Sequence, residues 1–374
     1  MGTLKVGIVG SAGRGGGFFG PFIHNPLTEI SALCDINVEG LKKTAEAAGV
    51  SSIYSDYEEM LEKAELDIVV IGTPMHLHVT QSVMALQRNI HVISEVPAAV
   101  SIKEAKQLEE ACRKSNARYM LSENYCYMRP NVLVKAIAKA GLFGEMYFGE
   151  GEYIHELKEL NEVTKWRRHW QTGINGCTYP THSLGPVYQW MGERVVSVSC
   201  VGSGHHYTDQ HGDIYENEDS TLMLCRMAKS GLVKIRLDML SNRPHNMTYY
   251  ALQGTEGCYE SDRGLGDEPK IWLKSRSKEM KWMPLKELEE EFLEERWLHP
   301  SKEALESGHG GGDYMVIEDF VDAVLNDKPM PIGIHEALDM TLPGLISQES
   351  IKNGSAWMDV PNSRDWQSCG GERQ

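Results

Sequence analysis

A glycine-rich turn directly after a short apolar run constrains the fold of this chain more than any other feature. Residues 4–9 have the composition of a buried strand, and residues 10–17 read Gly-Ser-Ala-Gly-Arg-Gly-Gly-Gly. Backbone without side chains lets a phosphate group reach the N–H groups at the start of a helix, so a strand, a phosphate-binding turn and a helix are expected here. The candidate phosphate-binding residues of the turn are Gly10, Gly13, Arg14 and Gly15.

Strand-like and helix-like segments alternate from this turn to about residue 124. Apolar runs predict strands at 30–34, 68–71, 90–94 and 118–121. Helical spacing of apolar residues predicts helices at 38–48, 57–64, 79–87 and 102–115. Strands joined through helices by right-handed crossovers form a doubly wound parallel sheet. We therefore predict an α/β chain whose residues 1–124 form an N-terminal Rossmann domain.

The pattern changes after residue 124 to longer strands of the antiparallel kind. These strands are expected at 146–156, 195–201, 222–225, 231–239 and 247–253. Helices are expected at 132–140, 183–190, 314–325 and 335–353, an acidic surface helix at 286–297, and a polar, loose tail from 361. Residues 125–374 are therefore predicted to form an α+β domain with a large, mainly antiparallel open sheet, which binds substrate and forms a homodimer or homotetramer.

An acidic residue after the second predicted strand indicates which dinucleotide the turn binds. Asp35 stands at the point where a carboxylate accepts both ribose hydroxyls and repels a 2′-phosphate. Ile36 and Asn37 follow it, so no arginine is present to hold such a phosphate. The cofactor is therefore predicted to be NAD; the alternative is a simple glycine turn followed by a helix-capping aspartate.

One loop at the predicted carboxyl edge of the sheet carries further polar residues. The loop after the strand predicted at 68–71 contains Thr73, Pro74, His76 and His78, all of which are candidates for cofactor binding. Either histidine could instead cap the following helix.

Composition limits the partners of the chain. Its 37 Lys and Arg against 53 Asp and Glu give a net charge of −16, which disfavours nucleic acid and anionic membranes and leaves a small-molecule substrate. No apolar run approaches a membrane span, and no basic and apolar leader precedes the first strand. Eight cysteines without a Cys-x-x-Cys pair indicate reduced thiols, so a cytoplasmic protein is expected.

The N-terminal half resembles the glucose-fructose oxidoreductase, inositol dehydrogenase and rhizopine-catabolism (Gfo/Idh/MocA) family. The motifs that carry the resemblance are the turn at 10–15, Asp35, Thr73-Pro74 with His76 and His78, Glu95-Val96-Pro97, and Asn124 with Arg129-Pro130. The resemblance implies that Glu95 and Asn124 lie near the nicotinamide ribose of the cofactor. Dehydrogenases of this family usually carry a lysine where Val96 stands and an aspartate where Thr178 stands. Simple alcohol oxidation by the usual lysine, aspartate and histidine set is therefore not expected.

A subgroup with both departures is the NAD-dependent glycosidases of glycoside hydrolase family 109, and this chain resembles them. The resemblance rests on the segments 94–99, 123–127, 149–155, 166–168, 179–186 and 308–313. It implies a redox-neutral glycosidase that acts on a small glycoside in four steps: transient oxidation of a ring carbon, taken as C3, elimination, hydration and re-reduction. Paired carboxylates of the ordinary glycosidase kind are not needed for such a reaction.

Candidate catalytic residues are His182, at the start of a predicted helix, and Tyr179, three residues earlier. Imidazole titrates near neutrality, and a tyrosine near cations can exchange protons, although Tyr179 could instead only pack and position Pro180. Candidate substrate-binding residues are Tyr127, His155, Arg167, His245 and His309. The histidines at 205–211 are interpreted as a solvated loop, and no metal is expected. Two alternatives remain open: a net NAD-dependent sugar or polyol dehydrogenase, and a non-catalytic NAD-bound sugar sensor.

Overall fold

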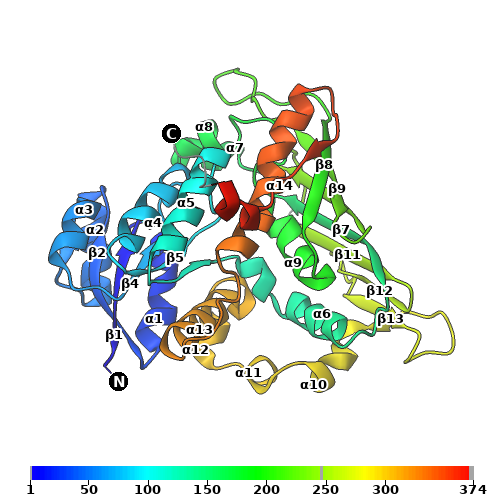
Figure 1. Cartoon of the computed structure of the whole chain (residues 1–374), viewed down its shortest axis with the longest axis horizontal. Helices are drawn as coiled ribbons and strands as arrows, with labels where there is room; N and C mark the ends of the chain where they lie inside the picture. The colour runs from blue at the N-terminus through cyan, green and yellow to red at the C-terminus, as the bar shows by residue number, and fades with distance from the viewer. Residues whose placement is uncertain (1, 245–246, 370–374) are drawn as a thin grey trace. The chain divides into compact units, whose positions relative to one another are not determined.

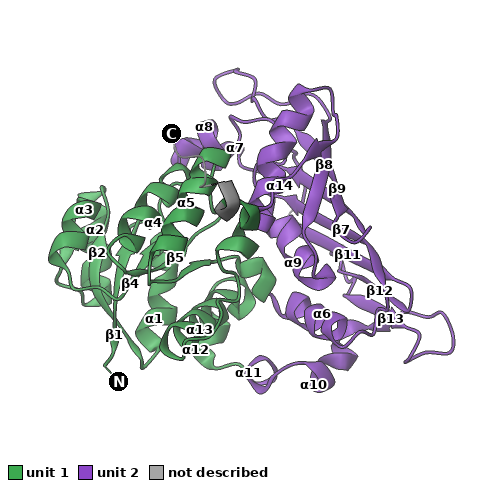
Figure 2. Cartoon of the chain, viewed as in Figure 1, with its two compact units in different colours: residues 1–127, 300–338, 363–374 green, residues 128–299, 339–362 purple. Residues whose placement is uncertain are grey.

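The computed structural model describes residues 2–244 and 247–369, which form two compact units (Figure 1, Figure 2). The described parts of residues 1–127, 300–338 and 363–374 form the first unit, and residues 128–299 and 339–362 form the second. The segments from 300–338 and 363–369 thus belong to the first unit, although the predicted division placed them in the second domain. Division of the chain into independently folding domains at residue 124 stays a prediction.

The first unit contains the predicted parallel sheet. Its six strands run in the order β3-β2-β1-β4-β5-β6, and every neighbouring pair is parallel. The strands are β1 (Leu4–Val9), β2 (Thr28–Cys34), β3 (Ile53–Tyr54), β4 (Ile68–Ile71), β5 (His91–Ser94) and β6 (Tyr119–Leu121). Strand β1 lies between β2 and β4, where the order reverses, and ligands of such sheets bind at the carboxyl ends of the strands at this point.

Several helices of the first unit begin at a capping side chain. Asn37, Asp56 and Ser101 each accept a hydrogen bond from a backbone N–H three residues ahead. The helices are α1 (Phe19–His24), α2 (Val38–Ala48), α3 (Tyr57–Lys63), α4 (His78–Leu86), α5 (Ile102–Lys114), α12 (Lys302–Glu306) and α13 (Gly312–Leu325). Short 3₁₀ turns precede α1, α4 and α13: η1 (Arg14–Phe18), η2 (Met75–Leu77) and η5 (His309–Gly311).

The second unit contains a nine-stranded sheet in the order β14-β13-β12-β11-β7-β10-β9-β8-β15. All neighbouring pairs are antiparallel except β7 with β10, which confirms the predicted mainly antiparallel sheet. The strands are β7 (Met146–Ile154), β8 (Val195–Gly202), β9 (Ser220–Met227), β10 (Leu232–Asp238), β11 (Thr248–Gly254), β12 (Gly257–Glu260), β13 (Lys270–Leu273), β14 (Met283–Pro284) and β15 (Met358–Asp359).

Helix α9 (Thr181–Met191) packs on the middle of this sheet, and α6 (Arg129–Lys139) packs beside α9 (Figure 1). Two glycines of β7 allow the close approach. A Cβ at Gly151 would stand 2.0 Å from the backbone oxygen of Ser183, and one at Gly149 would stand 2.6 Å from Val187. The backbone of α9 therefore lies directly against β7. Three further helices are α7 (Lys158–Val163), α8 (Trp166–Trp170) and α14 (Ile334–Lys352). Helix α14 contains residues of both units.

The prediction of a single acidic helix at 286–297 is wrong. The segment forms η4 (Leu285–Leu288), α10 (Glu289–Phe292) and α11 (Glu295–Leu298), with extended backbone at Leu293. Leu288 and Leu293 are both buried, although residues five apart on one helix face directions about 140° apart. Breaking the helix lets both side chains enter the core. The tail also differs, since Ser363–Cys369 forms a 3₁₀ helix, η6, instead of a loose chain.

Gly151→Ala is expected to destabilise the protein by about 1–3 kcal/mol, because the new methyl group has to displace the backbone of α9. Gly20→Ala is the matched control, since a Cβ there meets no atom within 4 Å. Thermal unfolding of both variants measures the difference. A melting temperature unchanged by Gly151→Ala would show that α9 does not need this close approach.

Candidate functional site

The glycine turn after β1 is held by backbone contacts that exclude other side chains. Gly10 has a φ of 78°, and a Cβ on it would stand 2.6 Å from the backbone oxygen of Gly72, just after β4. A Cβ on Gly15 would stand 2.7 Å from the oxygen of Gly10. A Cβ on Gly13 would meet only the Gly10 oxygen, at 3.7 Å, so this part of the turn is open. The turn thus combines a fixed backbone with room for a phosphate group to approach.

Asp35 stands at the carboxyl end of β2, next to this turn. Its Oδ2 accepts a hydrogen bond from the Ala12 N–H at 2.9 Å, and its Oδ1 accepts one from the Asn37 N–H at 2.8 Å. Each carboxylate oxygen has a second lone pair. The side chain is therefore held in one orientation and keeps acceptor capacity for the two ribose hydroxyls of a dinucleotide.

The two candidate histidines of the next loop differ in their surroundings. His78 is buried at the start of α4, with Nδ1 3.0 Å from the Pro97 oxygen and Nε2 2.8 Å from the Thr73 oxygen. Both ring nitrogens thus face backbone, and burial lowers the pKa of His78. His76 is half-buried, and burial followed by the nearby His78 lowers its pKa. His78 joins the loops at Thr73 and Pro97, whereas His76 is the histidine of this loop with solvent access.

A buried carboxylate, Asp313, connects three of the other predicted residues of the first unit. Its Oδ1 accepts a hydrogen bond from Asn124 Nδ2 at 2.9 Å, and its Oδ2 lies 3.3 Å from the Arg14 guanidinium and 3.1 Å from His309 Nδ1. Arg14 also donates from Nε to Glu95 Oε1 at 2.7 Å. Although burial favours the neutral acid, the hydrogen bond with His309 and the charge of Arg14 hold the pKa of Asp313 at about 2. Sequence reasoning missed Asp313, and its only signal was the family segment 308–313.

Asn124 provides a test of whether the first unit fits a dinucleotide. The residue is 3% exposed, and no described residue hydrogen-bonds its Oδ1. An orphaned acceptor of this kind is costly unless a ligand donor or water completes it. Together with the open turn at Gly13 and the oriented Asp35, it fits a ligand with hydroxyl groups and a phosphate bridge, as NAD has.

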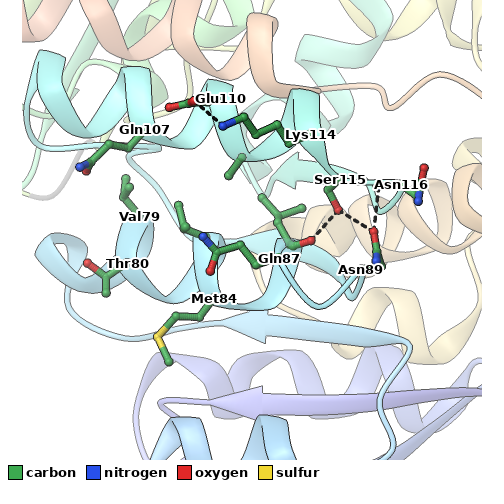
Figure 3. Close-up of a pocket in the computed structure, with 13 residues that line it drawn as sticks. Val79, Thr80, Met84, Gln87, Asn89, Gln107, Glu110, Lys114, Ser115 and Asn116 are labelled. Carbon is green, nitrogen blue, oxygen red and sulfur yellow. Dashed lines mark hydrogen bonds and ion pairs between the residues drawn. The ribbon is translucent and has the colours of Figure 1, made fainter.

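A groove of about 650 Å³ lies between α4 and α5 in the same unit (Figure 3). Polar side chains such as Gln87, Gln107 and Lys114 line it, and Lys114 pairs with Glu110 of its own helix at 2.6 Å. The lining contains none of the predicted cofactor or substrate residues. The groove is therefore separate from the site at the carboxyl edge of the sheet.

The second unit gathers four aromatic and imidazole side chains. The ring centroid of His182 is 5.0 Å from that of Tyr153 and 5.2 Å from that of Tyr179, and the two tyrosine rings are 5.9 Å apart. The Tyr153 hydroxyl lies 2.8 Å from His155 Nδ1. The structure thus brings together the predicted residues His155, Tyr179 and His182. Tyr153, which sequence reasoning missed, lies between them; its signal was its place in the segment 149–155.

The sequence positions these side chains through β7 and α9. Tyr153 is near the end of β7, and His182 is the second residue of α9, which begins after Pro180. Gly151 lets the first turn of α9 lie against β7, and the Tyr250 hydroxyl donates a hydrogen bond to the backbone oxygen of His182. The His182 ring is therefore fixed beside Tyr153 by backbone contacts as well as by ring packing.

The contacts of this cluster do not include the other predicted substrate residues, one of which is outside the described residues. Arg167, on α8, stacks on Trp166 and donates hydrogen bonds to the neutral side chains of Thr164 and Gln171. Tyr127 is buried in the first unit at the end of a 3₁₀ turn, η3 (Asn124–Tyr127), and His309 also belongs to the first unit. His245 lies outside the described residues.

The two departures from the dehydrogenase pattern are both buried neutral side chains. Val96 is 4% exposed, and Thr178 is 5% exposed with its hydroxyl 3.4 Å from the Gln171 oxygen. Neither can act as an acid or base near neutral pH. Among residues 2–244 and 247–369, no group of three or more histidines, cysteines or carboxylates is arranged to hold a metal ion, and no helix is long and apolar enough to cross a membrane.

The fold and these sites define an enzyme with an NAD-binding Rossmann domain of the Gfo/Idh/MocA class. Residues 4–123 match the model of the oxidoreductase family with an NAD-binding Rossmann fold, and residues 127–366 match the model of the glycosyl hydrolase 109 C-terminal domain. The chain therefore belongs to glycosyl hydrolase family 109, and NAD is its cofactor.

Relatives in sequence support this assignment, and a solved structure shares the fold. A glycosyl hydrolase family 109 protein of Streptomyces filamentosus is 30% identical over 96% of this chain and 77% of its own. An alpha-N-acetylgalactosaminidase of Shewanella oneidensis is 28% identical over 97% of this chain and 85% of its own. Levoglucosan dehydrogenase in complex with NADH and levoglucosan has the same fold, with a TM-score of 0.81 and 20% identity over 96% of this chain and 100% of that chain.

Asp35→Ala is expected to weaken NAD binding by about 1–3 kcal/mol, because it removes a charged hydrogen-bond acceptor. NADP binding should change less, since the carboxylate also repels a 2′-phosphate. Calorimetric titration with both nucleotides measures the two effects. An equal loss for NAD and NADP would mean that Asp35 acts only by holding the N–H groups of Ala12 and Asn37.

Proposed function

We propose that this protein is a redox-neutral glycosidase that acts on a small glycoside through transient oxidation of the sugar. The observation that carries the proposal is the cluster of Tyr153, Tyr179, His182 and His155 in the second unit. It offers proton-transfer groups in a chain that has Val96 and Thr178 where dehydrogenases of the same class place a lysine and an aspartate.

The cofactor site supplies the redox part of this reaction. When bound, NAD provides the reversible removal and return of a hydride. The residues that would hold it are the turn glycines, Asp35 at the ribose and Asn124 through its open Oδ1. Arg14 and Glu95 pair with each other beside the turn, and Thr73, Pro74, His76 and His78 shape the neighbouring loop.

The side chains of the second unit then serve three proton tasks. One group accepts the proton of the hydroxyl at C3 as it becomes a ketone, and a second accepts the C2 proton that this ketone acidifies. Loss of the C2 proton expels the C1 substituent, water adds to the resulting double bond, and the ketone is reduced again. We assign the first task to His182 and the second to Tyr179. The Tyr153 hydroxyl, 2.8 Å from His155 Nδ1, would pass a proton or donate a hydrogen bond to a developing oxyanion.

Substrate recognition is assigned to the predicted substrate-binding residues of both units. Arg167 keeps a charge whose described partners are neutral, so it suits a hydroxyl, acetamido or anionic group of a sugar. Tyr127, His155 and His245 remain candidates for sugar hydroxyls. Because one relative is an alpha-N-acetylgalactosaminidase, α-N-acetylgalactosaminides are the first substrates to test.

A net NAD-dependent sugar dehydrogenase is the second candidate. It is favoured by the fold shared with levoglucosan dehydrogenase, and it would use His182 with a tyrosine in place of lysine. A non-catalytic sugar sensor would need neither His182 nor a tyrosine for proton transfer. The difference between the two enzymes is whether NADH accumulates.

We further propose that a second copy covers the open face of the nine-stranded sheet, as a homodimer or homotetramer. The helices α6 and α9 cover the other face, and apolar residues such as Val201 and Leu232 are exposed on β8 and β10. The free cysteines support a reducing compartment such as the cytoplasm, since the seven that are described form no disulfide.

A screen of aryl glycosides of both anomers, with and without added NAD, tests the proposed function. We expect aglycone release without a matching rise in NADH absorbance. His182→Ala should lower turnover by about 100-fold or more while NAD binding stays intact, and His205→Ala, at an exposed histidine of the same unit, should have no effect. NADH formed in step with sugar consumption would favour the dehydrogenase, and neither product with saturable sugar binding would favour the sensor.

A further inference from the structure

We propose that residues 308–313 form part of the dinucleotide site, with His309 as a cofactor-binding residue for the pyrophosphate and Asp313 as the residue that positions it. Sequence reasoning assigned His309 to the substrate. The structure instead places it in the first unit, beside residues predicted to bind NAD.

The segment touches both sides of the predicted nucleotide site. Asp313 pairs with Arg14 of the glycine turn and with Asn124 after β6. Gly312, the first residue of α13, approaches the backbone so closely that a Cβ there would stand 3.1 Å from the Asn124 oxygen and 3.2 Å from the Tyr127 oxygen. A stretch about 185 residues after Asn124 in sequence is thus packed against the turn and the end of the sheet.

Two independent features of this region point to an anionic, hydroxylated ligand. Arg14 belongs to the glycine turn after β1, where a phosphate can approach the backbone, and it shares the Asp313 carboxylate with His309. Next to Asp313, the buried Asn124 keeps an Oδ1 that no described residue satisfies. A glycine turn with its arginine, together with an orphaned acceptor, fits the pyrophosphate and ribose of a dinucleotide.

The charges around His309 explain why its protonation would matter. Asp313 and Glu95 carry two negative charges against the single positive charge of Arg14, and the Tyr125 ring packs 5.6 Å from the imidazole. Neutral His309 leaves this cluster with a net charge of −1, which repels a pyrophosphate, whereas protonated His309 brings it to zero.

The hydrogen bond geometry leaves one N–H of His309 for the ligand. Its Nδ1 lies 3.1 Å from Asp313 Oδ2, and no described residue bonds Nε2. The side chain is 33% exposed. The hydrogen bond with Asp313 raises the pKa of His309 although burial opposes the charge. The imidazolium is therefore present below this raised pKa and is lost as the pH rises through it. NAD affinity should accordingly fall as the pH rises.

Titration calorimetry tests the proposal. NAD is titrated into the full-length protein, stripped of co-purified nucleotide, at about pH 6 and at about pH 8.5. The wild type should bind NAD about 3- to 10-fold more tightly at the lower pH. His309→Gln should bind as weakly at the lower pH as the wild type does at the higher one. His24→Gln is the matched control, because His24 is exposed and its Nδ1 lies 2.9 Å from the Gly20 oxygen of its own helix.

ADP-ribose, which carries the same pyrophosphate without nicotinamide, should show the same loss with His309→Gln. Asp313→Asn should lose the pH dependence as well, and its melting temperature without nucleotide reports whether it folds. The proposal is overturned if His309→Gln keeps wild-type affinity, if it loses affinity equally at both pH values, or if its ADP-ribose binding is unchanged.

Discussion

Close contact between backbones, made possible by glycines, positions both candidate sites of this protein. In the first unit Gly10 and Gly15 let the turn after β1 lie against the segment after β4, where any Cβ would overlap backbone atoms. In the second unit Gly151 lets α9 lie against β7. The first contact forms the phosphate-binding turn, and the second places His182 beside Tyr153. Without these approaches, neither set of side chains would be held in place.

The side chains that occupy these positions suit proton transfer without the usual lysine. Val96 and Thr178 are buried and neutral, and we therefore propose that the imidazole and phenol groups of the second unit act as acid and base. In the first unit Asp313 holds Arg14, Asn124 and His309 in one hydrogen-bonded set. The proposed dinucleotide site therefore includes a segment far from the glycine turn in sequence.

Local patterns predicted most of the first unit, because its signals lie within a few residues of one another. The caps Asn37, Asp56 and Ser101 fix the starts of three helices, and buried strands such as β4 are continuous apolar runs. Strands of two residues, such as β3 and β14, are too short for any periodicity to reveal. The role of Asp313 could not be predicted either, since its partner Arg14 is separated from it by 299 residues and no local pattern records such a pair. Tyr153 was missed for a related reason, because alternation along β7 indicates burial but not which rings it meets on α9.

The central claim is that the glycosidic bond breaks by elimination next to a transient ketone. A glycoside reaction run in D₂O measures this directly, with NMR of the released sugar. Deuterium should appear at C2, where a solvent-exchangeable base removes and returns the proton, while C3 keeps the hydrogen that NAD carries away and gives back. Direct displacement at C1 exchanges neither position, so an active reaction that leaves C2 without deuterium would contradict the account.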